Sequence, residues 1–163
     1  MIFVTVGTHE QGMNRLFEEI DNLIKKGEIK ETVFAQIGYS TYKPVNFKYK
    51  EMISFDEMND YINQSRITIT HGGPGSIFQV LNQNKVPIVV PRNPTFDEHV
   101  DDHQILFVSR IEAEKKVIGV YNIKDLIIKI SEYNQIMTQM GIHNSQKNIF
   151  IEKFDYLINK LTN

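Results

Sequence analysis

Short apolar segments alternate with amphipathic ones along most of the chain, and this alternation limits the possible folds more than any other feature. Strand-like segments are found at 2–6, 32–37, 47–53, 67–70, 87–90 and 117–121. Apolar residues recur at helical spacing in 13–24, 54–62, 77–81, 97–110 and 123–133. Strands that alternate with helices in this way predict an α/β fold built on a single Rossmann-like, doubly wound and mainly parallel sheet.

Length and composition restrict the classes of protein that fit. A chain of 163 residues predicts one domain over 1–163, with a helix at about 146–161 that packs on it or, alternatively, in a partner's groove. The net charge of −2 gives no electrostatic reason to expect nucleic acid as a partner. The chain has no cysteine and no apolar run as long as a membrane span, so we expect a cytoplasmic protein.

Two turns that contain glycine follow predicted strands. Gly7-Thr8 follows the first strand, and the run from His71 to Ser76 joins the fourth strand to its helix. In open α/β sheets, ligands bind beyond the carboxyl ends of the strands. A glycine-rich turn at a helix N-terminus presents backbone amides to an anion, usually a phosphate. Tight turning alone would explain Gly7, whereas the glycine density and the Ser76 hydroxyl favour a phosphate site at the second turn.

Two common nucleotide-binding motifs are missing from these turns. No Gly-Lys-Ser/Thr sequence is present, which argues against a P-loop. The first turn, Gly7 to Gly12, lacks the Gly-x-Gly-x-x-Gly pattern, and Gly38-Tyr39-Ser40 follows the second strand where an acidic residue would be needed. The sequence therefore disfavours an NAD-dependent enzyme.

The segment after the fifth strand is rich in hydrogen-bonding side chains, and Arg92 is expected to face a pyrophosphate there. His99 and His103 share a face of the predicted helix 97–110, which would suit a metal ion, but Val100 replaces the glutamate of the metalloprotease motif. Sugar recognition and a plain solvated face both rank ahead of a metal. Because the chain has no Asp-x-Asp, we expect no metal, with backbone amides and a helix dipole meeting the charge of a diphosphate.

Two apolar side chains after the third strand are candidates for a nucleobase site. Phe55 and Met58 could sandwich a uracil ring. Ordinary core packing is the alternative explanation for both.

Three sequence blocks resemble the C-terminal, donor-binding half of glycosyltransferase family 28, within the GT-B superfamily. They are Gly7-Thr8-His9 with Arg15-Leu16, His71 to Pro74, and Pro91-Arg92 with Glu98 to Gln104. The chain is most similar to PssE-like subunits of bacterial capsule and exopolysaccharide galactosyltransferases. The likeness covers most of the chain and implies the fold of the C-terminal half of a GT-B enzyme.

The resemblance also implies which residues surround a UDP-sugar donor. Phe55 and Met58 would lie near uracil, and Gln79 stands where many relatives have an acidic residue that binds the ribose hydroxyls. An amide binds a hydroxyl less strongly than a carboxylate does. The residues implied at the diphosphate are Gly7, Thr8, Gly73, Gly75 and Ser76; those implied at the hexose are Asp102, His103 and Gln104; and His71, Gly72, Arg92 and Glu98 belong to the same blocks.

A complete GT-B enzyme has two such domains, and this chain has the length of one. The resemblance implies a membrane-associated, acceptor-binding partner subunit of the PssD type, a lipid-linked saccharide as acceptor, and attachment to the inner face of the plasma membrane through that partner. Without the partner, a homodimer is conceivable. The expected function is that of the donor-binding, catalytic subunit of a two-component inverting hexosyltransferase in capsule or exopolysaccharide synthesis, with galactose as the sugar and a β-1,4 linkage.

Inverting transfer needs a general base for the acceptor hydroxyl. His9 is the first candidate and Glu10 the second, because the loop after the first strand should face the cleft between the two domains. A hydrogen bond that fixes this loop is the alternative role for His9, and the partner could supply the base instead. The alternative function is a non-catalytic nucleotide-sugar-binding module that recruits or regulates a polysaccharide assembly complex.

Overall fold

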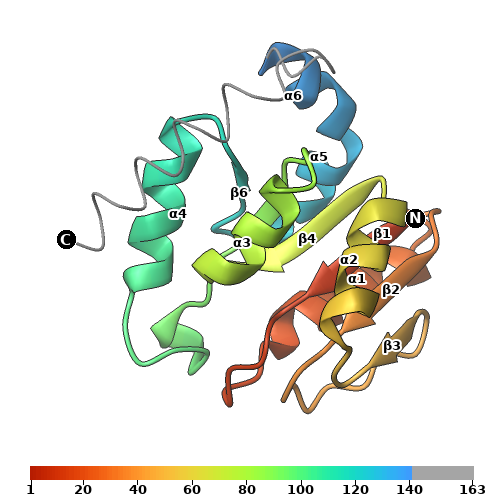
Figure 1. The fold of residues 1–163 in the computed structure, drawn as a ribbon. Coiled ribbons are helices and arrows are strands. Elements are labelled where there is room, and N and C mark those ends of the chain that lie inside the picture. Colours follow the sequence, from red (N-terminus) through yellow and green to blue (C-terminus); the bar gives the residue numbers. More distant parts are fainter. Residues whose placement is uncertain (141–163) are drawn as a thin grey trace. The chain divides into compact units, whose positions relative to one another are not determined.

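The computed structural model describes residues 1–140, and the chain separates into two compact units, Met1–Ser131 and Glu132–Asn163. The first unit holds one sheet of six strands in the order β3-β2-β1-β4-β5-β6, and every neighbouring pair is parallel (Figure 1). This confirms the predicted doubly wound α/β sheet. The strands are β1 (Ile2–Thr5), β2 (Val33–Gln36), β3 (Lys48–Lys50), β4 (Ile67–His71), β5 (Ile88–Val90) and β6 (Ile118–Gly119).

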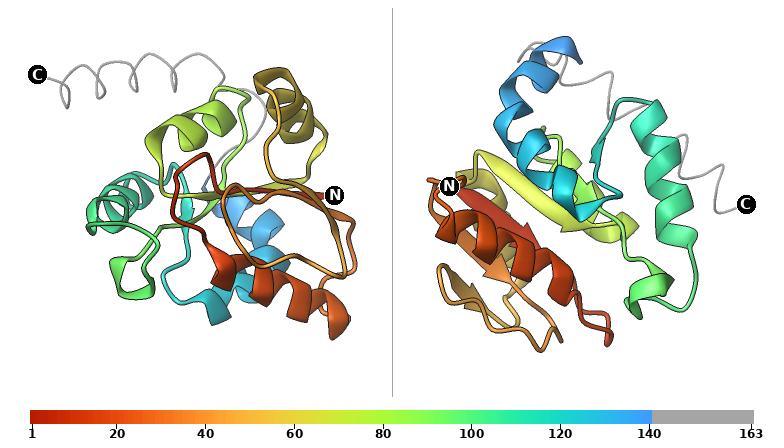
Figure 2. Two further views of the ribbon diagram at one scale, coloured as in Figure 1. Left: turned by 90° about the horizontal axis from the view of Figure 1, so that it is seen from below. Right: turned by 180° about the vertical axis from the view of Figure 1, so that it is seen from behind.

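Helices cover both faces of this sheet. Figure 2 shows α2 and α3 on one face and α1 with α5 on the other, and α4 packs beside β6. The predicted helix 123–133 is divided into a 3-10 turn, α5 and the start of α6, the described helix of the second unit. The helices are α1 (Asn14–Lys25), α2 (Phe55–Gln64), α3 (Pro74–Leu81), α4 (His103–Ala113), α5 (Leu126–Ser131) and α6 (Tyr133–Gln139), with 3-10 turns at Pro94–Phe96 and Ile123–Asp125. The helix predicted at 146–161 lies outside the described residues.

The core explains why the central strands consist almost entirely of apolar and β-branched residues, with Ile and Thr alternating in β4. All residues of β1, β4 and β5 are buried, because helices cover them from both sides. On the α2 and α3 face, Phe3, Ile62 and Val80 form a buried cluster against which Met58 packs. Met58 is half-buried and packs against this cluster, as the core-packing alternative for it expects.

Two helix boundaries follow from local chemistry that the sequence displays. Ser54 caps α2 in a capping box, accepting a hydrogen bond from the Glu57 amide while the Glu57 carboxylate accepts one from the Ser54 amide. Gly27 follows the end of α1 with a φ of +74°, the left-handed conformation that glycine adopts without strain. Both boundaries agree with the sequence-based expectation.

The predicted helix 97–110 is wrong at its start. A 3-10 turn covers Pro94–Phe96, Asp97 takes a left-handed φ of 57°, and α4 begins only at His103. The Asn93 side chain accepts a hydrogen bond from the Thr95 amide at 2.9 Å and stabilises this turn. His99 therefore precedes the helix, and it does not share a helical face with His103.

The first strand of the sheet order, β3, lies at an edge and pairs only with β2. Its two lysines, Lys48 and Lys50, are exposed, and Tyr49 between them is half-buried. Within residues 1–140, no helix is both long enough and apolar enough to cross a membrane.

Candidate functional site

The two glycine turns lie together at the point where the strand order reverses. Strands β1 and β4 are neighbours, with Thr5 opposite Thr70, but the chain continues from β1 to β2 on one side and from β4 to β5 on the other. Such a reversal opens a crevice at the carboxyl ends of the two strands. The turn at Gly7 leaves β1 there, and the turn from Gly72 to Ser76 leaves β4. The structure thus brings the two predicted phosphate turns to one crevice.

The His71 ring fills the space between the two turns. A Cβ atom on Gly7 would stand 2.7 Å from the Cε1 atom of His71, and one on Gly73 would also overlap the ring. Gly7 has a φ of +70°, so glycine is required there both by its backbone and by the neighbouring ring. His71 therefore positions both turns, which the sequence did not reveal.

Burial makes His71 neutral over the whole physiological pH range. Its side chain is only 8% exposed, and this burial, together with the positive charges of Arg92 and His9, lowers its pKa to about 3. A hydrogen bond to the Thr5 backbone acts in the opposite direction and is the weaker effect. A neutral ring adds no charge to the crevice, so any anion there must be bound by other groups.

Acid should destabilise the protein through this histidine. Below a pH of about 6.5, His71 takes up a proton in the unfolded chain but not in the folded one, so stability falls as the pH decreases from there towards 3. Between pH 7 and pH 5 we expect a loss of about 2 kcal/mol, which the His71→Gln variant should not show. Urea unfolding of both proteins at both pH values measures this difference. Equal losses in the two proteins would contradict the assignment.

The N-terminus of α3 opens onto the crevice without a cap. Gly73 is the N-cap residue and provides no side-chain hydrogen bond, Pro74 follows it, and the first turn holds no acidic residue. The first amides of a helix have no partner within the helix, so those of Gly75 and Ser76 remain for water or a ligand. A Cβ atom on Gly75 would meet nothing within 4 Å, so a bulky anion can approach. The helix dipole adds positive potential at this point.

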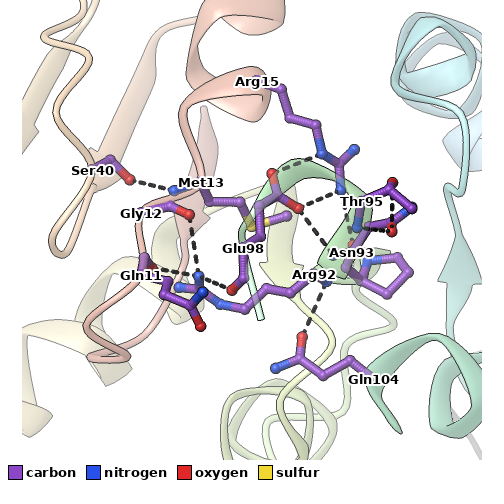
Figure 3. A network of polar contacts seen from close by, with 11 residues as sticks. Gln11, Gly12, Met13, Arg15, Ser40, Arg92, Asn93, Thr95, Glu98 and Gln104 are labelled. Atoms are coloured by element: carbon purple, nitrogen blue, oxygen red, sulfur yellow. Dashed lines mark hydrogen bonds and ion pairs between the residues drawn. The ribbon is translucent and has the colours of Figure 1, made fainter. Parts of the chain in front are cut away.

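Arg92 does not face this opening as the sequence predicted. Its side chain is fully buried, and it donates hydrogen bonds to the carbonyl oxygens of Gln11 (2.5 Å), Val6 (2.8 Å) and Glu98 (3.0 Å), as Figure 3 shows in part. These carbonyls belong to the loop after β1 and to the loop after β5. Arg92 therefore holds the two loops together rather than presenting a free cation. A side chain at a strand end can point inward or outward, and the sequence pattern does not distinguish the two.

A second arginine, Arg15 at the start of α1, completes the network in Figure 3. Its Nε and Nη2 atoms donate to the two carboxylate oxygens of Glu98 at 2.8 and 2.9 Å, and Nη2 also reaches the carbonyl of Pro91. Glu98 is 3% exposed, and it also accepts from the Asn93 amide. Arg15 was part of a family block but had no assigned role. Eighty-three residues separate it from Glu98, so no local signal marks the pair.

The loop after β1 holds His9 in a defined orientation. Its Nδ1 atom accepts a hydrogen bond from the Gln11 amide at 3.1 Å, and its ring lies 4.9 Å from that of His99. Partial burial lowers the pKa of His9, and Arg92 and His99 add to this effect. The neutral ring therefore carries its proton on Nε2 and presents a donor. Glu10, next to it, is exposed.

The start of α4 groups the residues predicted to bind the hexose. Gln104 accepts a hydrogen bond from the Arg92 amide at 3.1 Å, and its Cβ lies against Gly72. His103 is exposed, and its Nδ1 atom lies 2.8 Å from Asp101, whose other oxygen lies 3.1 Å from Nδ1 of His99. Asp102 is exposed at the N-cap position, where its side chain makes no capping bond. Within the described part of the chain, no group of three or more His, Asp or Glu side chains is arranged to hold a metal ion.

The predicted nucleobase residues divide between surface and core. Phe55, the first residue of α2, is 71% exposed and can stack on a planar ligand, whereas Met58 packs in the core. Gln79 donates to Asn59 at 3.0 Å and so connects α3 to α2. Thr8 is exposed at the crevice.

Comparisons with known proteins place the chain in a family. The model of the glycosyltransferase family 28 C-terminal domain matches residues 1–160. No curated protein matches the chain. Among solved structures, the glycotransferase of kitacinnamycin superposes with a TM-score of 0.59 at 14% identity, over 86% of this chain and 37% of that one. The glycosyltransferase SnogD from Streptomyces nogalater gives 0.44 at 16% identity with the same coverage. The chain thus spans little more than a third of these proteins.

Proposed function

Because the chain belongs to the glycosyltransferase family 28 C-terminal domain family, we propose that it is the donor-binding, catalytic half of an inverting glycosyltransferase. It transfers a hexose from a UDP-sugar to a lipid-linked saccharide, and the hexose that we propose is galactose. The proposal places it in the synthesis of capsule or exopolysaccharide. The family match confirms the resemblance that the three sequence blocks indicated.

The uncapped N-terminus of α3 is the observation that carries this proposal. The amides of Gly75 and Ser76 lie in the first turn of this helix, and a Cβ atom on Gly75 would meet nothing within 4 Å, so we place the diphosphate there. When the bond between sugar and UDP breaks, negative charge develops on the departing phosphate oxygen. Fixed amide dipoles stabilise such charge without a metal ion. Phe55 is available for uracil, and the start of α4 for the hexose.

Inverting transfer requires that the acceptor oxygen bond to the anomeric carbon as the bond to the β-phosphate oxygen breaks, with the acceptor proton passing to a base. His9 can accept this proton at Nε2 only if its own proton moves to Nδ1, which would break the hydrogen bond from Gln11. Glu10 has no such conflict. We therefore place Glu10 ahead of His9 as the base that this chain supplies, unless the partner subunit provides it.

A second polypeptide completes the enzyme in this proposal. The chain spans 37% of the length of the kitacinnamycin enzyme, and we propose that a separate subunit supplies the acceptor-binding half. A membrane-associated subunit of the PssD type would supply it and bring the complex to the inner face of the plasma membrane. The engaged Nδ1 of His9 also favours, as a second candidate, a module that binds nucleotide sugar without catalysis. Glycosyl transfer by the chain with its partner, compared with the partner alone, distinguishes the two.

A thermal-shift series tests the diphosphate site directly. A ligand at a hundred times its Kd stabilises the folded state by about 2.7 kcal/mol, which raises the melting temperature of a domain of this size by roughly 5–10 °C. We expect such a shift with UDP and with UDP-galactose, a much smaller one with uridine at the same concentration, and no change when a chelator is added. Equal shifts with uridine and UDP would remove the diphosphate from the proposal, and a shift abolished by the chelator would require a metal.

A further inference from the structure

A half-open cavity of about 270 Å³ lies beside the crevice, on residues to which nothing above assigns a ligand. It is formed by the start of α1, the loop between β2 and β3, and the 3-10 turn Pro94–Phe96. Its volume is close to the lower limit of about 300 Å³ for small-molecule sites. The side chains that decide its chemistry are Asn14, Arg15, Tyr39, Thr41, Phe96 and Asp97.

Two aromatic rings on separate segments line this cavity while remaining accessible. Tyr39 is 59% exposed and Phe96 is 56% exposed. The Arg15 guanidinium lies over the Phe96 ring, 4.9 Å from its centre, and holds the ring in place. Flat aromatic surfaces of this kind bind the apolar C–H face of a sugar ring.

The polar groups of the cavity are arranged in advance. The Asn14 amide donates to the Thr41 hydroxyl at 2.8 Å and accepts from the Thr41 backbone amide at 3.0 Å. Asp97 is held in its left-handed conformation, and its carbonyl accepts a hydrogen bond from the Gln11 side chain at 3.0 Å. Strained backbone that a fixed contact maintains is typical of binding sites. An amide, a hydroxyl and a carboxylate are the groups that bind sugar hydroxyls.

The charges of the cavity exclude an anionic ligand. Arg15 is the one cation among its lining residues, and both oxygens of Glu98 neutralise it. The remaining charge is the negative carboxylate of Asp97. A phosphate or a carboxylate would be repelled there, whereas a neutral polyhydroxyl ligand with an apolar face would be bound.

We propose that this cavity binds one neutral sugar unit of the saccharide that receives the transferred hexose. Glu98 connects the cavity to the loop after β1, since its carboxylate binds Arg15 and its carbonyl accepts from Arg92, which also binds the Val6 carbonyl in that loop. The loop after β1 contributes Gly12 to the cavity and carries Glu10, the proposed base. The role as acceptor site rests on the proposed function, whereas the binding of a sugar does not.

Saturation-transfer NMR with simple glycosides tests the proposal. Methyl β-D-galactopyranoside and methyl β-D-glucopyranoside are the neutral probes, and the methyl glycoside of glucuronic acid is the charged one. We expect millimolar binding of a neutral probe and weaker binding of the acid. Phe96→Ala and Tyr39→Ala should each lower the affinity for the neutral probe about tenfold. Phe96→Tyr, which keeps the ring, and Val45→Ala, which shortens a more exposed apolar side chain outside the cavity, should bind like the wild type.

The possible outcomes distinguish a failure of the sugar-binding cavity from a failure of the proposed donor-binding function. The cavity proposal is overturned if neither neutral probe receives saturation, or if Phe96→Ala and Tyr39→Ala both bind as the wild type does. UDP should stabilise both variants as it does the wild type, which shows that the donor crevice is intact. If the probes bind but UDP does not, the cavity is a sugar site and the donor function fails. If UDP binds and the probes do not, the donor proposal stands and the cavity is not a sugar site.

Discussion

The Ser76→Glu variant is expected to lose at least a hundredfold in affinity for UDP while unfolding at the same temperature as the wild type or a higher one. Ser76 is the third residue of α3, so the new carboxylate would lie where we place the diphosphate. Two charges about 4 Å apart at a protein surface repel by about 4 kcal/mol, more than enough for this loss. A carboxylate in the first turn of a helix stabilises it by about 0.3–1 kcal/mol. Calorimetric titration with UDP and a melting curve measure the two effects.

Two control variants give this result its meaning. Ser76→Ala removes only the hydroxyl and should lower the affinity for UDP by roughly two- to tenfold. Gln64→Glu adds the same charge at an exposed position at the end of α2 and should leave UDP binding unchanged. Tight UDP binding by Ser76→Glu would show that the diphosphate does not lie at the N-terminus of α3.

Replacing Arg92 with methionine should lower the free energy of unfolding by about 3–5 kcal/mol. Methionine keeps the apolar contacts of the side chain but removes the donors that bind the carbonyls of Val6, Gln11 and Glu98. These carbonyls would then lack their buried partner, which accounts for most of the loss. Urea unfolding measures the change. Faster amide hydrogen exchange at 7–13 and 93–98 would locate it in the two loops.

The size of this effect depends on burial and not on charge alone. Lys43→Met likewise removes a cation, here from an ion pair with Glu51 whose two side chains are largely exposed, so the expected loss is below about 1 kcal/mol. Arg92→Lys keeps the charge but lacks the planar guanidinium with its several donors. Its loss in the free energy of unfolding should therefore lie between those of Arg92→Met and Lys43→Met. If Arg92→Met costs no more than Lys43→Met, Arg92 does not hold the loops together.

The fold could be predicted because the central strands are covered on both faces and therefore consist almost entirely of apolar and β-branched residues. Helix boundaries could be predicted where one local group decides them, as Ser54 does for α2 and Gly27 for α1. The start of α4 could not, because Asp97 looked like a suitable first residue. The sequence does hold the contrary signals: Asn93 and Pro94 favour a turn, and Asp101 accepts a hydrogen bond from the His103 amide at the true start.

Only the parts of the candidate site that are formed by backbone turns could be predicted from the sequence. The glycine turns after β1 and β4 follow from the strand pattern, and parallel strands bring them to one edge. The inward turn of Arg92 and the pairing of Arg15 with Glu98 depend on contacts between residues more than 80 positions apart. The position of His71 between two glycines likewise depends on the packing of neighbouring strands. The cavity between Tyr39 and Phe96 has the same origin, and no motif marks it.

The open edge at β3 limits how copies of this chain can associate. Two molecules that joined their sheets through this edge in antiparallel register would place Lys48 and Lys50 of each chain opposite lysines of the other. Like charges directly across a strand pair are destabilising, and edge lysines commonly protect proteins from such joining. We therefore expect that a homodimer of this chain, if one forms, uses another surface and does not continue the sheet from one molecule into the next.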